Sequence, residues 1–167
     1  MVVALAGWGL TIHSSRRRFA ARLNSGVRPH TNIQGTRGDQ LNGFGCVRCW
    51  PTSAEDAWIA KSGSTVDRFL IDEPHYIVSI WLCPTCTQRF LSITTETIDW
   101  KDGEDPIYRT LIPITKQEAE SLKRSGRPTE DMLNAIGRDR RSLKYDYPKD
   151  SPPTTYWSTG VRMGMHD

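Results

Sequence analysis

The sequence predicts an α+β domain, with a small antiparallel sheet of about three strands and two to three helices. Three observations lead to this prediction. Runs rich in β-branched and aromatic residues cluster between residues 66 and 114. Helix-capping patterns precede residues 54, 117 and 130. Two Cys-x-x-Cys pairs, at 46–49 and 83–86, have a spacing typical of a metal site and not of a disulfide framework.

The first 44 residues predict a flexible basic arm. Residues 1–38 contain no acidic residue, and their six arginines include Arg16, Arg17, Arg18 and Arg22. Glycine, proline and asparagine recur from residue 26 onward and interrupt any regular element. The apolar run 1–10 has no basic segment before it and is far shorter than the roughly 20 residues that cross a bilayer. We therefore expect a cytoplasmic protein with no membrane segment.

The elements expected between residues 45 and 114 are one helix and four strands. Ser53 can cap a helix over residues 54–61, with Asp56 at the third helical position. Residues 66–71 predict a short strand. Residues 75–82, 89–98 and 108–114 then predict a three-stranded antiparallel meander. The second cysteine pair falls in the first turn of that meander.

Two further helices and an extended tail are expected after the meander. Thr115 and Glu118 form a capping box ahead of residues 117–123, and Thr129 can open a helix that runs to about residue 143. Gly137 weakens the second of these helices. Prolines at 148, 152 and 153 predict an extended tail. The expected organisation is an arm over residues 1–44, a domain over 45–145 and a tail over 146–167.

The cysteines carry the strongest chemical signal in the sequence. Two cysteines three residues apart, bent around a tight turn, can present both sulfurs to one ion, and Pro84 favours such a turn. Four thiolates complete the tetrahedral shell of a structural zinc ion, whereas catalytic zinc keeps one position open. The predicted ligands are Cys46, Cys49, Cys83 and Cys86. An iron–sulfur cluster is the alternative metal group.

The two cysteine pairs and the hairpin beside them resemble the zinc-ribbon and treble-clef class of folds. In that class one knuckle lies on a loop and the other joins two strands. The chain departs from the common pattern because neither 47–48 nor 85–87 contains the glycine that knuckles often have. The resemblance implies a metal ion and a scaffold, and it implies no particular activity.

The function that we expect from the sequence is a non-catalytic binding module with a protein partner, of an accessory, regulatory or toxin-neutralising kind. Acidic residues crowd one expected hairpin turn, and the chain contains six tryptophans. It contains no phosphate-binding loop, serine nucleophile elbow or zinc-protease helix motif. These features favour binding over catalysis.

Two alternatives remain open at this point. The first is nucleic-acid binding, with the arginines of the basic arm, Arg16, Arg17, Arg18 and Arg22, on phosphates. Residues 39–167 oppose it, because they carry 16 basic and 19 acidic side chains. The second is a metal-dependent hydrolase that uses His75 with nearby carboxylates. Those carboxylates are Glu96, Asp99, Asp102, Glu104 and Asp105.

Overall fold

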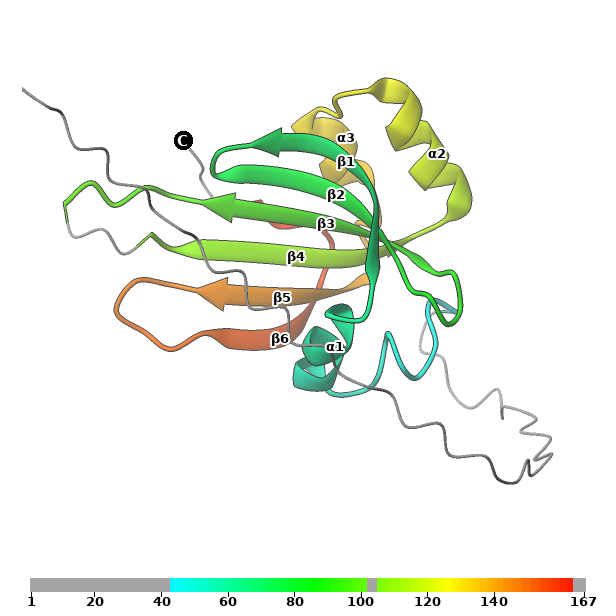
Figure 1. The fold of residues 1–167 in the computed structure, drawn as a ribbon, viewed down its shortest axis with the longest axis horizontal. Helices are drawn as coiled ribbons and strands as arrows, with labels where there is room; N and C mark the ends of the chain where they lie inside the picture. Colours follow the sequence, from blue (N-terminus) through cyan, green and yellow to red (C-terminus); the bar gives the residue numbers. More distant parts are fainter. Residues whose placement is uncertain (1–42, 102–104, 164–167) are drawn as a thin grey trace, which may run out of the picture. The chain divides into compact units, whose positions relative to one another are not determined.

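A computed structural model describes residues 43–101 and 105–163, and its centre is one six-stranded antiparallel sheet (Figure 1). The strands follow one another in the sheet in chain order, so each pairs only with its sequence neighbours. Their bounds are β1 Thr65–Glu73, β2 Tyr76–Leu82, β3 Arg89–Glu96, β4 Ile107–Ile114, β5 Arg141–Tyr147 and β6 Thr154–Thr159. The predicted α+β class and antiparallel sheet are confirmed, but the sheet has twice the expected number of strands.

The first four strands arise where β-branched and aromatic residues predict them. Pro74 and His75 join β1 to β2, and His75 has a φ of 65°. A proline followed by a left-handed residue is the order that a type II turn prefers. The second cysteine pair joins β2 to β3, as expected, because Leu82 and Arg89 are the last partners of that ladder.

Three helices lie among the described residues, and each begins at a capping side chain. They are α1 Ala54–Lys61, α2 Lys116–Ser125 and α3 Glu130–Ala135. The Ser53 side chain accepts a hydrogen bond from the Asp56 backbone N–H at 3.2 Å. Thr115 and Glu118 form the predicted capping box of α2. In the part of the chain that the structure describes, no helix is long and apolar enough to span a membrane.

The sheet buries a different set of side chains on each face. One face, with α2 and α3, forms a core of aliphatic residues such as Val78, Ile80 and Ile112. The opposite face packs against α1 and the cysteine pairs through Trp50, Phe90 and other buried residues. We call this second side of the sheet the α1 face. Cys49 and Cys83 are thus part of one of the two cores, and Cys46 packs against it.

The prediction of a helix from residue 129 to about 143 is wrong beyond Ala135. Gly137 adopts a φ of 62°, which a continuing helix does not allow, and a β-carbon there would lie 2.6 Å from Ile112 Cδ1. Residues 141–147 instead form β5, with Leu143 and Lys144 both buried on opposite faces. Tertiary pairing with β4 decides this segment.

The expected extended tail over 146–167 contains the sixth strand. Residues 154–159 are rich in threonine and aromatic residues, which favour a strand, and they pair with β5 from Thr154 to Thr159. The prolines at 152 and 153 precede this strand and do not interrupt it. The segment after β6 also contributes to the fold, because Val161 and Met163 pack against the aliphatic core.

Candidate metal centre

The first knuckle, residues 45–50, is a tight turn fixed by backbone hydrogen bonds to Cys46. The Cys46 carbonyl accepts the N–H groups of Cys49 at 3.1 Å and of Trp50 at 2.8 Å. The Cys46 N–H in turn points at Cys49 Sγ, 3.3 Å away. Gly45 enters this turn with a φ of 77°. The turn places both sulfurs on the same side of the chain.

The second knuckle, residues 83–88, closes the β2–β3 hairpin. The Cys83 N–H donates to the Gln88 carbonyl and the Thr87 N–H donates to the Cys83 carbonyl, each at 2.9 Å. Thr87 has a left-handed φ of 60°. A threonine therefore occupies a backbone conformation in which glycine has no steric cost.

The surroundings of Cys49, Cys83 and Cys86 shift the pKa values of their thiols in different directions. Burial raises the pKa of the Cys49 thiol and also that of the Cys86 thiol. Burial acts in the same direction on Cys83, but backbone hydrogen bonds from Cys86 and Thr85 and contacts with the other thiols outweigh it, and the pKa of Cys83 falls to about 7. Backbone N–H groups aimed at a sulfur stabilise a thiolate, which is the form that binds metals.

The four sulfurs converge on one point between the two knuckles. Cys46 Sγ lies 3.7 Å from Cys49 Sγ, and Cys49 Sγ lies 3.6 Å from Cys86 Sγ. All four Sγ atoms lie within 4.8 Å of one another. A tetrahedral ion with bonds of about 2.3 Å to sulfur requires about 3.8 Å between its ligands. The arrangement of Cys46, Cys49, Cys83 and Cys86 can therefore coordinate one metal ion.

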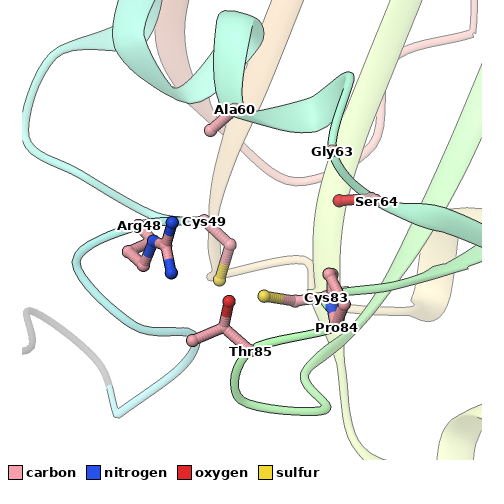
Figure 2. A pocket seen from close by; sticks show the side chains of 8 residues that line it. All are labelled: Arg48, Cys49, Ala60, Gly63, Ser64, Cys83, Pro84 and Thr85. Atoms are coloured by element: carbon pink, nitrogen blue, oxygen red, sulfur yellow. The ribbon is translucent and has the colours of Figure 1, made fainter. Parts of the chain in front are cut away.

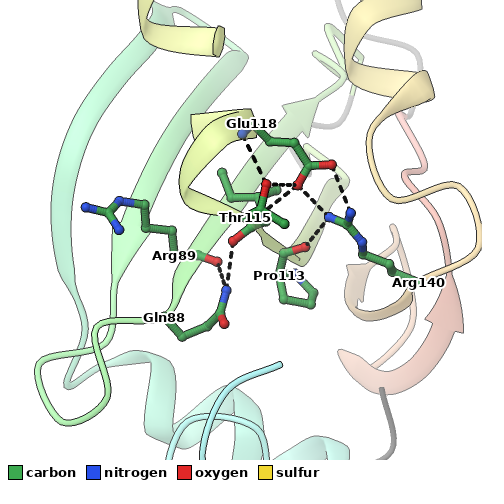
Figure 3. A network of polar contacts seen from close by, with 7 residues as sticks. Gln88, Arg89, Pro113, Thr115, Glu118 and Arg140 are labelled. Carbon is green, nitrogen blue, oxygen red and sulfur yellow. Dashed lines mark hydrogen bonds and ion pairs between the residues drawn. The ribbon is translucent and has the colours of Figure 1, made fainter. Parts of the chain in front are cut away.

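Gln88 connects the two knuckles to the sheet, a role that no sequence pattern predicts. Its Oε1 accepts the Gly45 N–H at 3.2 Å, and its Nε2 donates to the carbonyls of Arg89 at 2.6 Å and Ile114 at 2.9 Å. The residue thus joins the first knuckle, the second knuckle and the end of β4. Figure 3 shows its bonds to the sheet beside the capping box of α2.

Arg140 connects Phe44, the residue just before the first knuckle, to the body of the domain. Its guanidinium lies 4.7 Å from the ring centre of Phe44 and forms a bidentate ion pair with Glu118, at 2.7 and 2.9 Å (Figure 3). It also donates to the Pro113 carbonyl at 3.1 Å. Although burial raises the pKa of Glu118, its hydrogen bonds with Arg140 and Thr115 outweigh burial and lower it.

A small half-open cavity of about 220 Å³ lies next to the sulfurs. Figure 2 shows the Cys49 and Cys83 sulfurs beside it, with Arg48 and Thr85 on the knuckle side. The end of α1 and the start of β1 close the other side, at Ala60, Gly63 and Ser64. The cavity belongs to the immediate surroundings of the metal centre.

The remaining candidate residues do not join the cysteine site. His75 Nδ1 lies 2.9 Å from Glu96 Oε2, so the structure does bring one predicted pair together. His75 precedes β2 and Cys83 follows it, and seven residues at about 3.3 Å each separate the two positions by roughly 20 Å. Asp99 pairs with Lys149 and its N–H donates to Asp105 at 2.6 Å.

Some of the predicted residues lie outside the described part of the chain. They are Arg16, Arg17, Arg18 and Arg22 of the basic arm, together with Asp102 and Glu104 of the expected acidic turn. No protein-family model, no curated protein and no solved structure matches this chain.

Proposed function

We propose that this chain is a non-catalytic binding module whose fold is held by one structural zinc ion. The observation that supports the proposal is the convergence of Cys46, Cys49, Cys83 and Cys86, with all four sulfurs within 4.8 Å. Four thiolates leave no open coordination position for water, so zinc bound here would hold the fold together and would not activate a nucleophile.

The spacing of the sulfurs favours a single ion over an iron–sulfur cluster. In a cluster with several irons, the cysteines bind different iron atoms, which holds their sulfurs farther apart than the ligands of one ion. The sulfur–sulfur distances of 3.7 Å between Cys46 and Cys49 and 3.6 Å between Cys49 and Cys86 fit one tetrahedral ion. Zinc is the common occupant of such four-cysteine sites.

Zinc at this position would stabilise the α1 face in particular. The first knuckle has no regular structure of its own, and the Ser53 cap of α1 lies only four residues after Cys49. The ion would connect this segment to the β2–β3 hairpin and so keep Trp50 packed on Phe90, where the ring centres are 5.1 Å apart. Structural zinc sites in small domains contribute about 10–16 kcal/mol of apparent binding free energy, as much as a whole domain has in net stability.

Metal content of the purified full chain tests the proposal. We expect about one zinc per chain, and we expect the double variant Cys83→Ser/Cys86→Ser to lose it. Thr85→Ser, between these two ligands, is the matched control and should retain the metal. Chelation should lower the melting temperature and shift the tryptophan emission to the red as Trp50 becomes exposed. A chain that is folded and free of metal, or that contains stoichiometric iron, would contradict the proposal.

Contact with a protein partner is a more specific role that we propose for this binding module. Trp100 follows β3 and is 87% exposed, which is unusual for an indole ring and typical of residues that anchor a partner. Two of the acidic residues near it, Asp99 and Asp105, are already hydrogen-bonded within the chain. Proteins that co-purify with the wild type and are lost from a Trp100→Ser variant of unchanged stability would support this role.

A further inference from the structure

The α1 face contains a cluster of aromatic rings that the metal centre does not use. Trp58 of α1 stacks on Tyr145 of β5, with ring centres 4.2 Å apart and an angle of 7° between the planes. Lys61 of α1 lies over the Trp58 ring at 4.5 Å and over the Trp81 ring of β2 at 4.7 Å. The cluster thus extends across the sheet from β2 to β5. All four side chains are partly exposed and accessible to a ligand.

Two cations in this cluster have no acidic partner. Within residues 43–101 and 105–163, no carboxylate lies within 4.0 Å of Lys61 or Arg109, whereas Arg89 of the neighbouring strand β3 pairs with Asp67. Arg109 of β4 lies 5.8 Å from the ring centre of Tyr145, and its Nε is buried without a hydrogen-bond partner. Burial, reinforced by the charge of Arg109, lowers the pKa of Lys61 to about 8. Both cations would gain from an anion placed between them.

We propose that this cluster, Trp58, Lys61, Trp81, Arg109 and Tyr145, binds single-stranded nucleic acid, with a phosphate at the two cations and a base against the rings. The inference rests on the proposed function, because a zinc-stabilised binding module needs a ligand surface and the metal fixes the segment that leads into α1. Proteins that bind single strands combine basic grooves with exposed aromatic rings, because every base has a face that can stack.

The geometry favours this ligand over an acidic protein segment or a double helix. An acidic peptide would satisfy Lys61 and Arg109 but would make no use of the flat rings beside them. In a duplex the base faces are already stacked on one another and cannot reach the rings. Of these three ligands, only a single strand offers phosphates and free base faces together. The surface also differs from the one expected from the sequence, because it lies on the sheet and not on Arg16, Arg17, Arg18 or Arg22.

Fluorescence anisotropy of the zinc-loaded full chain with labelled single-stranded DNA and RNA of about 12 nucleotides tests the proposal. We expect binding that weakens with salt, and quenching of tryptophan emission as bases reach Trp58 and Trp81. The double variant Lys61→Gln/Arg109→Gln should weaken binding at least tenfold, and should reduce the slope of log K against log salt by about 0.7, since the two cations share one phosphate and each phosphate contact on a single strand contributes about 0.7. Tyr145→Leu should weaken binding about fivefold to 100-fold while the slope is unchanged.

Arg124→Gln is the matched control, because Arg124 is an exposed cation on α2, against the opposite face of the sheet. It should bind like the wild type. Each variant is compared with the wild type at equal zinc content and equal melting temperature. If a variant without the Arg109 charge folds poorly, Arg109→Lys is measured in addition. This variant keeps the charge and should retain most of the affinity.

Several outcomes would overturn the proposal. One is the absence of binding by the wild type at low salt, and another is a loss of affinity in Arg124→Gln as large as that in the double variant. A third is an affinity that depends on Arg16–Arg18 and is unchanged by substitution of Lys61 and Arg109. The last is binding of a mononucleotide, a duplex or an acidic peptide in preference to the single strand. Any of these with one zinc per chain would reject the ligand surface and leave the zinc module intact. A chain without zinc would reject the module first.

Discussion

Gly45 allows a direct test of how the first knuckle holds the metal ligands. The residue has a φ of 77°, and a β-carbon on it would lie 2.7 Å from Trp50 Cβ and 3.2 Å from Cys49 Sγ. The first of these atoms is fixed to the backbone and the second is a proposed ligand, so neither can move away without disturbing the site. Gly45→Ala should therefore weaken metal binding.

Gly43 supplies a control with nearly the same backbone conformation. Its φ is 70°, and a β-carbon there would meet no atom within 4 Å. Both alanine variants incur about 1–2 kcal/mol for the left-handed conformation. Only Gly45→Ala adds a steric collision, which in packed interiors costs about 1–3 kcal/mol. The difference between the variants, about 5- to 150-fold in zinc affinity, isolates the collision.

Competition with a chromophoric chelator measures the two zinc affinities, and urea unfolding of the zinc-loaded chains measures their stabilities. We expect Gly43→Ala to lose no more zinc affinity than its backbone strain accounts for, because its β-carbon would meet no atom within 4 Å. Equal zinc affinities for the two variants would refute the reasoning, since the turn would then tolerate a β-carbon against Cys49.

Two further predictions concern backbone strain and pH. Thr87→Gly should raise the free energy of unfolding by about 1 kcal/mol, because Thr87 is β-branched and has a φ of 60°. Asp150→Gly, at a φ of 58°, should gain less, because aspartate adopts this conformation more readily. Equal gains of the two variants in urea unfolding would contradict the argument. Lys144 is 2% exposed and bonded to Thr110 Oγ1 and the Gly160 carbonyl. Burial lowers the pKa of Lys144 from 10.5 to about 8. Between these pH values the unfolded chain binds more protons than the folded chain, so the free energy of unfolding should rise with pH by at most about 1.4 kcal/mol per pH unit. Lys144→Met should reduce this rise, and an unchanged rise in unfolding experiments at pH 7.5 and 9.5 would reject the assignment.

Local sequence patterns were sufficient where a short segment decides its own structure. Ser53 and Thr115 mark the starts of α1 and α2, because a capping side chain acts on backbone groups within three residues. The strand at residues 75–82 and the cysteine turn after it were also predictable. The doubled Cys-x-x-Cys spacing identified the four residues whose sulfurs the fold brings together.

The C-terminal half shows the limit of such patterns. Residues 129–143 have helical spacing, yet only Glu130–Ala135 is helical, because Gly137 must pack against Ile112 and the following residues gain more from pairing with β4. The last strand, Thr154–Thr159, follows two prolines and has no helical or alternating signal strong enough to identify it. The preceding strand, β5, supplies its hydrogen bonds in the sheet.

The sequence by itself identified the four cysteines whose sulfurs the fold brings together, the capping residues of the three helices and the antiparallel α+β class, since capping patterns, strand composition and the Cys-x-x-Cys spacing are each recognised within short segments. Only the tertiary structure decided the six-stranded sheet, the connecting role of Gln88 and the meeting of Lys61 with Arg109 across the α1 face. The sheet depends on pairing between whole strands, and the contacts of Gln88 with Gly45 and of Lys61 with Arg109 each join residues more than 40 positions apart. Sheet pairing and packing establish such contacts, and they have no local pattern.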